Sequence, residues 1–153
     1  MLLLGMLGGA LWAFIPGYLK SLGLVNETIT TLLLNSIAPK IVAFFVFGFW
    51  HSPMDTNKTP NFVPAARLPT LFNSRIDLSF IVALVLLAIF WFVMKQTRWG
   101  LEMRAIGGNP QAAKRNGLPI HGYWVAIMCI GGAIAGLAGM AQVSGYYLSL
   151  IHI

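Results

Sequence analysis

The chain has 153 residues, of which only 9% are charged and 58% are apolar, and its mean hydropathy is +0.76. Ordinary soluble domains carry roughly 25% charged residues, so this composition excludes a water-soluble globule and indicates a membrane protein. The net charge of +6 does not indicate a nucleic-acid binder, because the basic residues lie in short gaps between apolar runs. A single cysteine, Cys129, excludes a disulfide framework within the chain.

Four long apolar runs follow one another along the chain, at residues 1–18, 29–50, 78–94 and 123–143. About 20 predominantly apolar residues cross a bilayer core, so each run is a candidate transmembrane helix. We therefore predict an all-α membrane protein, a polytopic helix bundle with about four spans. No basic segment precedes the first run, so we expect no secretory signal there. We expect instead that the chain begins inside a helix of a larger protein.

The second apolar run contains Pro39 and Lys40 near its centre. A lysine at the middle of a span costs about 2.5 to 3.5 kcal/mol on insertion scales, so it should face a bundle interior or a watery cavity, or mark a break. The adjacent proline favours a break. Two interpretations remain, one kinked span or a half-helix over Glu27–Ala38 followed by a second segment, and we favour the kinked span.

Polar residues gather at the start of this second run. They are Asn26, Glu27, Thr30, Thr31 and Asn35. The last four recur at spacings of three and four, which places them roughly on one helix face. Such a stripe on an apolar helix indicates a wet cavity, and we name the five residues as candidates for a substrate pathway. Hydrogen bonding between helices, or capping by Asn26, is the alternative.

The segments between the apolar runs differ in charge. Residues 95–122 hold five Lys or Arg residues, whereas residues 51–77 hold three. Because positive residues are retained on the cytoplasmic side, we predict that residues 95–122 are cytoplasmic. Alternation then places residues 19–28 inside and residues 51–77 outside. The outer segment is rich in Pro, Asn and Thr, which predicts an irregular extracytoplasmic loop.

The cytoplasmic residues 98–117, called the 98–117 loop below, carry signals for a short helix. Asn is a strong N-cap, Pro is favoured at the first helical position and Gly just past the end, so we predict a capped helix over Pro110–Asn116. Upstream, Leu101–Ile106 is expected to form another turn before Gly107 and Gly108 break it. Small Ala112 and Ala113 should lie on the surface of this unit. The pattern is typical of a docking element for a partner protein, or of a connector bound to lipid headgroups.

The fourth apolar run contains two stripes of small residues. Gly132 and Gly136 form a G-x-x-x-G pair, and the neighbouring stripe contains Gly131, Ala135 and Gly139. Such stripes let helix backbones approach closely in membranes, so we predict a packing role for these five residues. The first run repeats the pattern at Gly5 and Gly9. His51 and His121 have no second ligand at metal spacing, so we expect surface residues and no metal site.

The 98–117 loop also resembles a known family. Its sequence TRWGLEMRAIGGNPQAAKRNGLP is similar to the cytoplasmic coupling segment of bacterial ABC importer permeases of the branched-chain amino acid and simple-sugar group, with the pattern T-R-x-G-x-x-x-R-A-x-G-x-N-x-x-A-A. GGAIAGLAGMAQVSGYY resembles the small-residue helix that follows in that family. PGYLKSLGLVNETITTLLLN is similar to members proposed to import nucleosides. The resemblance covers most of residues 12–147.

The resemblance implies a function and a set of partners. Such permeases pair as two subunits, take substrate from an extracytoplasmic binding lipoprotein and insert a coupling helix into a cytoplasmic ABC ATPase. The chain has no G-x-x-x-x-G-K-[ST] motif, so we expect no enzyme activity and no cofactor on it, with ATP bound by the partner ATPase. We expect a multi-pass protein of the bacterial plasma (inner) membrane that contacts membrane lipid. The resemblance further implies that the pathway candidates hydrogen-bond the ribose or base of a nucleoside.

By matched position, the resemblance assigns ATPase coupling to part of the 98–117 loop. The candidates are Glu102, Arg104, Ala105, Gly107, Asn109, Pro110, Ala112 and Ala113. The alternative for Glu102 is a solvated charge near Arg98, and for Arg104 it is an anchor that fixes orientation.

Family members are roughly twice as long, so we expect residues 1–147 to be part of a permease transmembrane domain. The closing LSLIHI, residues 148–153, resembles a translated adapter sequence, and we expect a non-native tail there. Simple sugars follow nucleosides as expected substrates, and branched-chain amino acids come third. A non-transporting membrane scaffold or assembly subunit is the alternative function. A secondary transporter should show an inverted repeat of the hydrophobic pattern, which the four runs do not show.

Overall fold

A computed structural model describes residues 2–23, 25–48 and 78–143. All regular elements in these ranges are helices: α1 (Leu2–Ser21), α2 (Glu27–Gly48), α3 (Leu78–Gln96), α4 (Arg98–Gly108), α5 (Pro110–Arg115) and α6 (Ile120–Gln142). Four of them, α1, α2, α3 and α6, are long and apolar enough to cross a membrane. The predicted all-α polytopic architecture is therefore confirmed.

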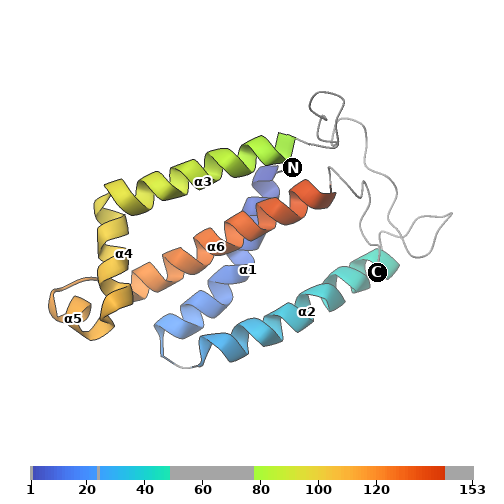
Figure 1. The fold of residues 1–153 in the computed structure, drawn as a ribbon. Helices are drawn as coiled ribbons and strands as arrows, with labels where there is room; N and C mark the ends of the chain where they lie inside the picture. The colour runs from blue at the N-terminus through green and yellow to red at the C-terminus, as the bar shows by residue number, and fades with distance from the viewer. Residues whose placement is uncertain (1, 24, 49–77, 144–153) are drawn as a thin grey trace.

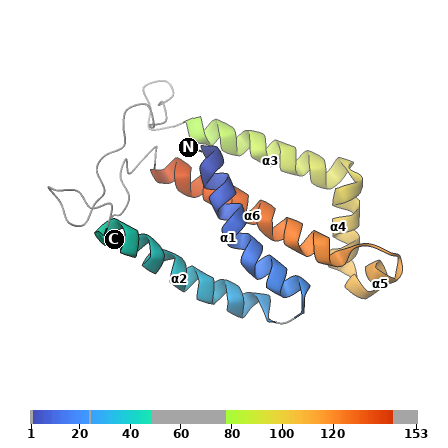
Figure 2. The same ribbon diagram turned by 180° about the vertical axis from the view of Figure 1, so that it is seen from behind.

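The long helices run alternately back and forth between the two ends of the bundle. Figures 1 and 2 show the α1–α2 turn at the same end as α4 and α5, and the start of α3 and the end of α6 at the opposite end. Helix α4 stands across the end of α3, and α5 follows it at the tip. This arrangement agrees with the alternation expected from the sequence, which placed residues 19–28 and 95–122 on one side of the membrane.

The centre of the bundle is the crossing of α1 and α6, which pack more extensively than any other pair of described helices. Their backbones touch through glycines: a Cβ atom added to Gly9 would lie 2.1 Å from the carbonyl oxygen of Gly132, and one added to Gly136 would lie 2.1 Å from that of Gly5. Only glycine permits this distance, and dispersion between closely spaced backbones is a main source of helix association in membranes.

The second small-residue stripe on α6 lies outside the close contact with α1. A Cβ added to Gly131 or Gly139 would meet nothing within 4 Å in the described chain, and Ala135 is exposed. The structure thus brings Gly132 and Gly136 to the α1 contact and leaves Gly131, Ala135 and Gly139 outside it.

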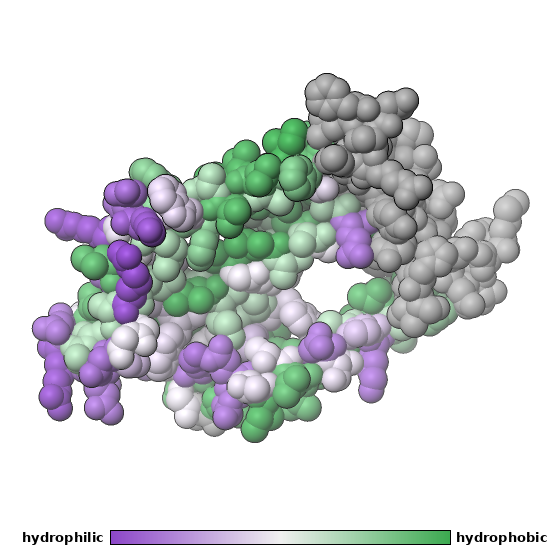
Figure 3. All heavy atoms as spheres, viewed as in Figure 1, coloured by the Kyte–Doolittle hydropathy of each residue, from purple (hydrophilic) through white to green (hydrophobic). Residues whose placement is uncertain are grey.

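Most large apolar side chains lie on the outside of the bundle. Helix α3 has no buried residue, and Leu3, Phe44 and Leu87 are each more than half exposed. Figure 3 shows hydrophobic residues along α3, whereas hydrophilic residues gather at the end that carries α4 and α5. An apolar exterior of this extent requires a covering of lipid or further helices, because monomeric soluble proteins rarely expose large apolar patches.

Helix α2 is continuous through Pro39, so a single span is the better of the two interpretations. The helix begins at Glu27, and Lys40 is exposed on it. At 3.6 residues per turn, the nine positions between Thr31 and Lys40 place them roughly 180° apart around the helix. Lys40 therefore faces away from the side of α2 that carries Thr31. The predicted outer loop at residues 51–77, which follows this helix, and the tail at residues 148–153 both lie outside the described residues.

Candidate functional site

The 98–117 loop folds into α4 and α5, and its first turn is fixed by Thr97. The Thr97 hydroxyl donates to the Val93 carbonyl at 2.6 Å and accepts from the Gly100 amide at 3.2 Å. Gly100 lies so close to the end of α3 that a Cβ atom there would be 2.3 Å from the Met94 carbonyl oxygen. These contacts set the sharp turn at which α4 leaves α3 (Figure 1).

Helix α5 begins at Pro110, as the sequence predicted, and ends at Arg115, one residue before the predicted end. The Asn109 side-chain oxygen accepts from the Ala112 amide at 3.0 Å, and Pro110 is the first helical residue. At the other end the Asn116 side-chain amide donates to the Ala112 carbonyl at 3.0 Å, and Gly117 has a φ of 80°. The prediction of a capped helix here is confirmed.

The expected break at Gly107 and Gly108 is wrong, because both residues lie within α4. The helix ends at Gly108, and the amide of the next residue, Asn109, donates to the Ala105 carbonyl at 3.1 Å. Asn109 therefore terminates α4 and caps α5. Each glycine costs a helix only about 1 kcal/mol relative to alanine, which the packing of the preceding turn offsets.

That packing is a small core between the loop and α6. Ile106, Ala113 and Ile120 are 4%, 4% and 6% exposed and pack together, with Leu118, Tyr123 and Trp124 against them. The expectation that Ala113 lies on the surface is therefore wrong, since α5 turns this side chain inward to cover the two isoleucines. Ala112 is exposed as expected. The loop is thus a compact unit attached to the start of α6.

Tyr123 of α6 holds α4 by two contacts. Its hydroxyl donates a hydrogen bond to the Glu102 carboxylate, and its ring stacks on Trp99 with centroids 6.2 Å apart. Glu102 is therefore engaged inside the unit and is half-buried. The remaining coupling candidates form the outer surface of the loop and are exposed: Arg104, Ala105, Gly107, Asn109, Pro110 and Ala112.

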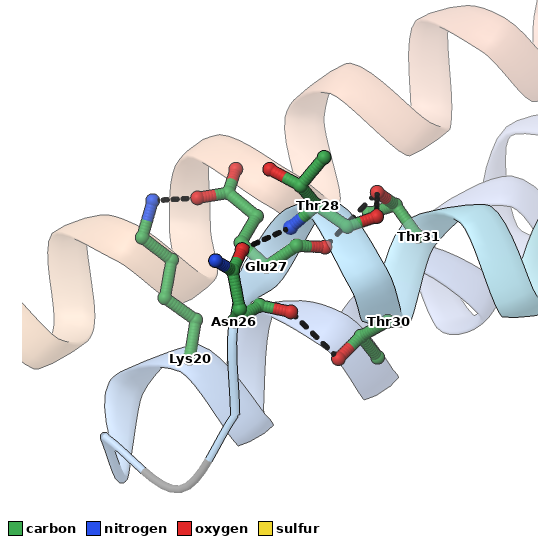
Figure 4. Close-up of polar contacts among 6 residues, drawn as sticks. All are labelled: Lys20, Asn26, Glu27, Thr28, Thr30 and Thr31. Atoms are coloured by element: carbon green, nitrogen blue, oxygen red, sulfur yellow. Dashed lines mark hydrogen bonds and ion pairs between the residues drawn. The ribbon is translucent and has the colours of Figure 1, made fainter.

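The polar residues at the start of α2 bond mainly to their own helix. Asn26 caps it by accepting from the Thr28 amide at 2.9 Å, while the Thr30 hydroxyl donates to the Asn26 carbonyl at 3.1 Å. The Thr31 hydroxyl donates to the Glu27 carbonyl at 3.0 Å. Figure 4 shows these bonds together with an ion pair between Glu27 and Lys20 of α1. The structure thus includes the capping by Asn26 that the sequence allowed.

Two of the five pathway candidates, Thr31 and Asn35, line a cavity of about 420 Å³ between α1, α2 and α6. Trp12 adds an indole to the lining, and the other walls of the cavity are apolar. The remaining lining residues are Ala13, Pro16, Leu34, Ile127, Met128, Gly131, Gly132 and Ala135. A concave apolar space with a few polar groups is the usual form of a small-molecule site. Asn26, Glu27 and Thr30 do not line it.

Sequence reasoning missed several residues that the structure brings to these sites. Trp12 contributes an aromatic wall to the cavity, and Trp99, Tyr123 and Trp124 hold the loop on α6. His121 is exposed, as expected, but also contacts the Ser21 carbonyl of α1. No local sequence pattern indicates the roles of these residues, because each role depends on a contact between separate helices. Among the described residues no group of three or more His, Cys, Asp or Glu side chains could hold a metal ion.

Four apolar spans and a compact polar unit at one end define a multi-pass membrane protein. The chain belongs to the family described as branched-chain amino acid transport system / permease component, whose model matches residues 1–150. This agrees with the resemblance that the sequence showed, and it places the chain in the plasma (inner) membrane.

The individual relatives include proteins that are named as nucleoside and sugar permeases. The guanosine ABC transporter permease protein NupP of Bacillus subtilis is 34% identical over 91% of the chain and 41% of its own length. The glucose ABC transporter permease protein TsgB13 of Haloferax volcanii is 32% identical over 95% of the chain and 41% of its own length. The nucleoside ABC transporter permease protein NupB of Lactococcus lactis is 30% identical over 97% of the chain and 44% of its own length. The chain thus spans less than half the length of these relatives, and no solved structure matches it.

Proposed function

We propose that the chain is part of the membrane-spanning permease subunit of an ATP-driven importer, with nucleosides as substrates. The observation that carries this proposal is the 98–117 loop, a capped two-helix unit with its own buried core at one end of an apolar bundle. A connector bound only to headgroups needs no such core. A rigid unit can transmit force from a partner to the helix it is packed on.

The partner on this face is a cytoplasmic ABC ATPase. The exposed surface from Arg104 to Ala112 consists mainly of small or short side chains, which allow a close fit in a protein groove. The chain itself has no phosphate-binding loop, so ATP binds and is hydrolysed on the partner, and the chain is not an enzyme. A second permease subunit and an extracytoplasmic substrate-binding lipoprotein complete the importer, with residues 1–147 forming part of its transmembrane domain.

The substrate class rests on the cavity and on the names of the relatives. Trp12 offers a flat aromatic face, and Thr31 and Asn35 offer a hydroxyl and a carboxamide in an otherwise apolar wall. Stacking and a few hydrogen bonds suit a planar base with an attached sugar. Two of the relatives above are named for guanosine or nucleosides and one for glucose, so a simple sugar is the second candidate.

Co-purification of the ATPase with the full-length permease tests the coupling role. Replacing Ala112 by Trp places a large side chain on the exposed face of α5 and is expected to abolish co-purification. Leu87→Trp is the matched control, because Leu87 is 65% exposed on α3, away from the loop, and this variant should keep the ATPase bound. Retention of the ATPase by Ala112→Trp, or by a Gly-Ser replacement of residues 109–113, would contradict the docking role. If no uptake depends on the chain, it is a scaffold.

A further inference from the structure

Lys20, the penultimate residue of α1, contacts two other helices at the end of the bundle that carries the loop. Its ammonium forms an ion pair with the Glu27 carboxylate at the start of α2, as Figure 4 shows. The same ammonium lies 5.3 Å from the ring centroid of Trp124 on α6. The Lys20 and Glu27 side chains are only 30% and 37% exposed. Partial removal from water strengthens both the ion pair and the cation–π contact.

A second set of contacts holds the same helix ends together. His121, in the first turn of α6, donates from Nδ1 to the Ser21 carbonyl at the end of α1. Its ring meets Trp124 edge to face with centroids 6.1 Å apart. Trp124 is therefore in contact with both His121 and Lys20.

Trp124 also packs against the core that attaches the 98–117 loop, formed by Ile106, Ala113 and Ile120. A continuous series of contacts thus leads from α5 through this core to Trp124, then to Lys20 and Glu27. Glu27 begins the helix that carries Thr31 and Asn35 into the cavity. Helix α2 packs against α1 far less extensively than α6 does. The ion pair therefore adds a side-chain contact to the short turn that joins the start of α2 to the end of α1.

We propose that Lys20 is a positioning residue, which transmits movement of the 98–117 loop to α2 by holding Glu27 against Trp124. The proposal rests on the proposed function, because it takes the loop to be the element that the ATPase moves. Displacement of the loop core shifts Trp124, and the ammonium that is shared between the indole and the carboxylate draws the start of α2 with it. Transport driven by ATP then depends on Lys20, although Lys20 touches neither ATPase nor substrate.

The test uses the full-length permease reconstituted in vesicles with its ATPase, second permease subunit and binding protein, and measures guanosine uptake per ATP hydrolysed. Lys20→Met keeps the apolar stem and removes the charge. Uptake per ATP is expected to fall about two- to thirtyfold, the range seen for residues that couple distant sites, with ATPase co-purification unchanged. Lys20→Arg keeps both contacts and should restore coupling. Glu27→Gln should lower coupling in the same way.

Lys95 offers a matched control, because its ammonium also lies over an indole, 5.8 Å from the ring centroid of Trp91. Both residues belong to α3, so this contact joins no helices, and Lys95→Met should leave uptake per ATP unchanged. The proposal is overturned if Lys20→Met couples as well as the unaltered protein, or if Lys20→Arg is as defective as Lys20→Met. If the unaltered permease fails to retain the ATPase, the proposed function itself has failed, which is a separate result.

Discussion

The glycine contact between α1 and α6 gives a sharp prediction, because neighbouring glycines serve as controls. Gly9 lies against Gly132, where an added Cβ would be 2.1 Å from a carbonyl oxygen, whereas ordinary contacts begin at 3.4 Å. Gly9→Ala therefore forces the two backbones apart by more than an ångström. Overpacking of this kind costs about 1 to 3 kcal/mol, offset in part by up to about 1 kcal/mol from the higher helix propensity of alanine.

Gly8 is the adjacent control, since a Cβ there meets nothing within 4 Å. Gly8→Ala gains the propensity term without the clash, so the two variants should differ by about 1 to 3 kcal/mol in the free energy of unfolding. Thermal unfolding of the purified protein in detergent, followed by loss of the monodisperse peak in size-exclusion chromatography, measures the order of the two transitions. The packing described for α1 and α6 is refuted if Gly9→Ala unfolds at or above the temperature of Gly8→Ala.

Three further predictions concern the loop and the outer face of α2. Gly100→Ala should displace α4 and abolish ATPase co-purification. Gly8→Ala, on α1 and outside the docking surface, meets open space and should keep the ATPase bound; equal binding by both variants would contradict the turn geometry. Asn109→Ala removes the cap of α5 at a cost of about 1 kcal/mol, which should weaken ATPase binding about fivefold when the permease is titrated with the ATPase. Asn109→Asp keeps an accepting oxygen at the cap and should bind the ATPase normally. The Lys40 ammonium needs a polar surrounding in the full-length protein. Lys40→Cys, in a background without the native cysteine, should therefore react with a charged thiol reagent, whereas Leu87→Cys should not. Protection of both cysteines from the reagent would place position 40 in lipid.

Local signals explain why α5 could be predicted from the sequence. Asn109, Pro110 and Gly117 each act through backbone geometry within a few residues, so their pattern fixes the helix ends without knowledge of the fold. The same is true of the four spans, which follow from length and composition alone. The continuous course of α2 through Pro39 was the harder choice, because proline and the adjacent lysine weaken a helix by amounts that neighbouring helices can offset.

Contacts between distant residues explain what could not be predicted. Helix α4 continues through Gly107 because Ile106 is fixed in a core with Ala113 and Ile120, and no local pattern indicates that core. The hydrogen bond between His121 and Ser21 joins positions 100 residues apart. The two glycine pairs were visible on their own helices, but only the structure shows that Gly5 and Gly9 meet Gly132 and Gly136.

The crossing of α1 and α6 has a mechanical consequence. Where bulky side chains interlock, one helix can move along another only if rotamers change, and each change meets an energy barrier. At the glycine contact the touching surfaces are mostly main chain, so a small sliding displacement there disturbs few side chains. Shear of packed helices is one of the ways in which proteins change shape, and this smooth junction is where the described bundle can yield with the least internal rearrangement.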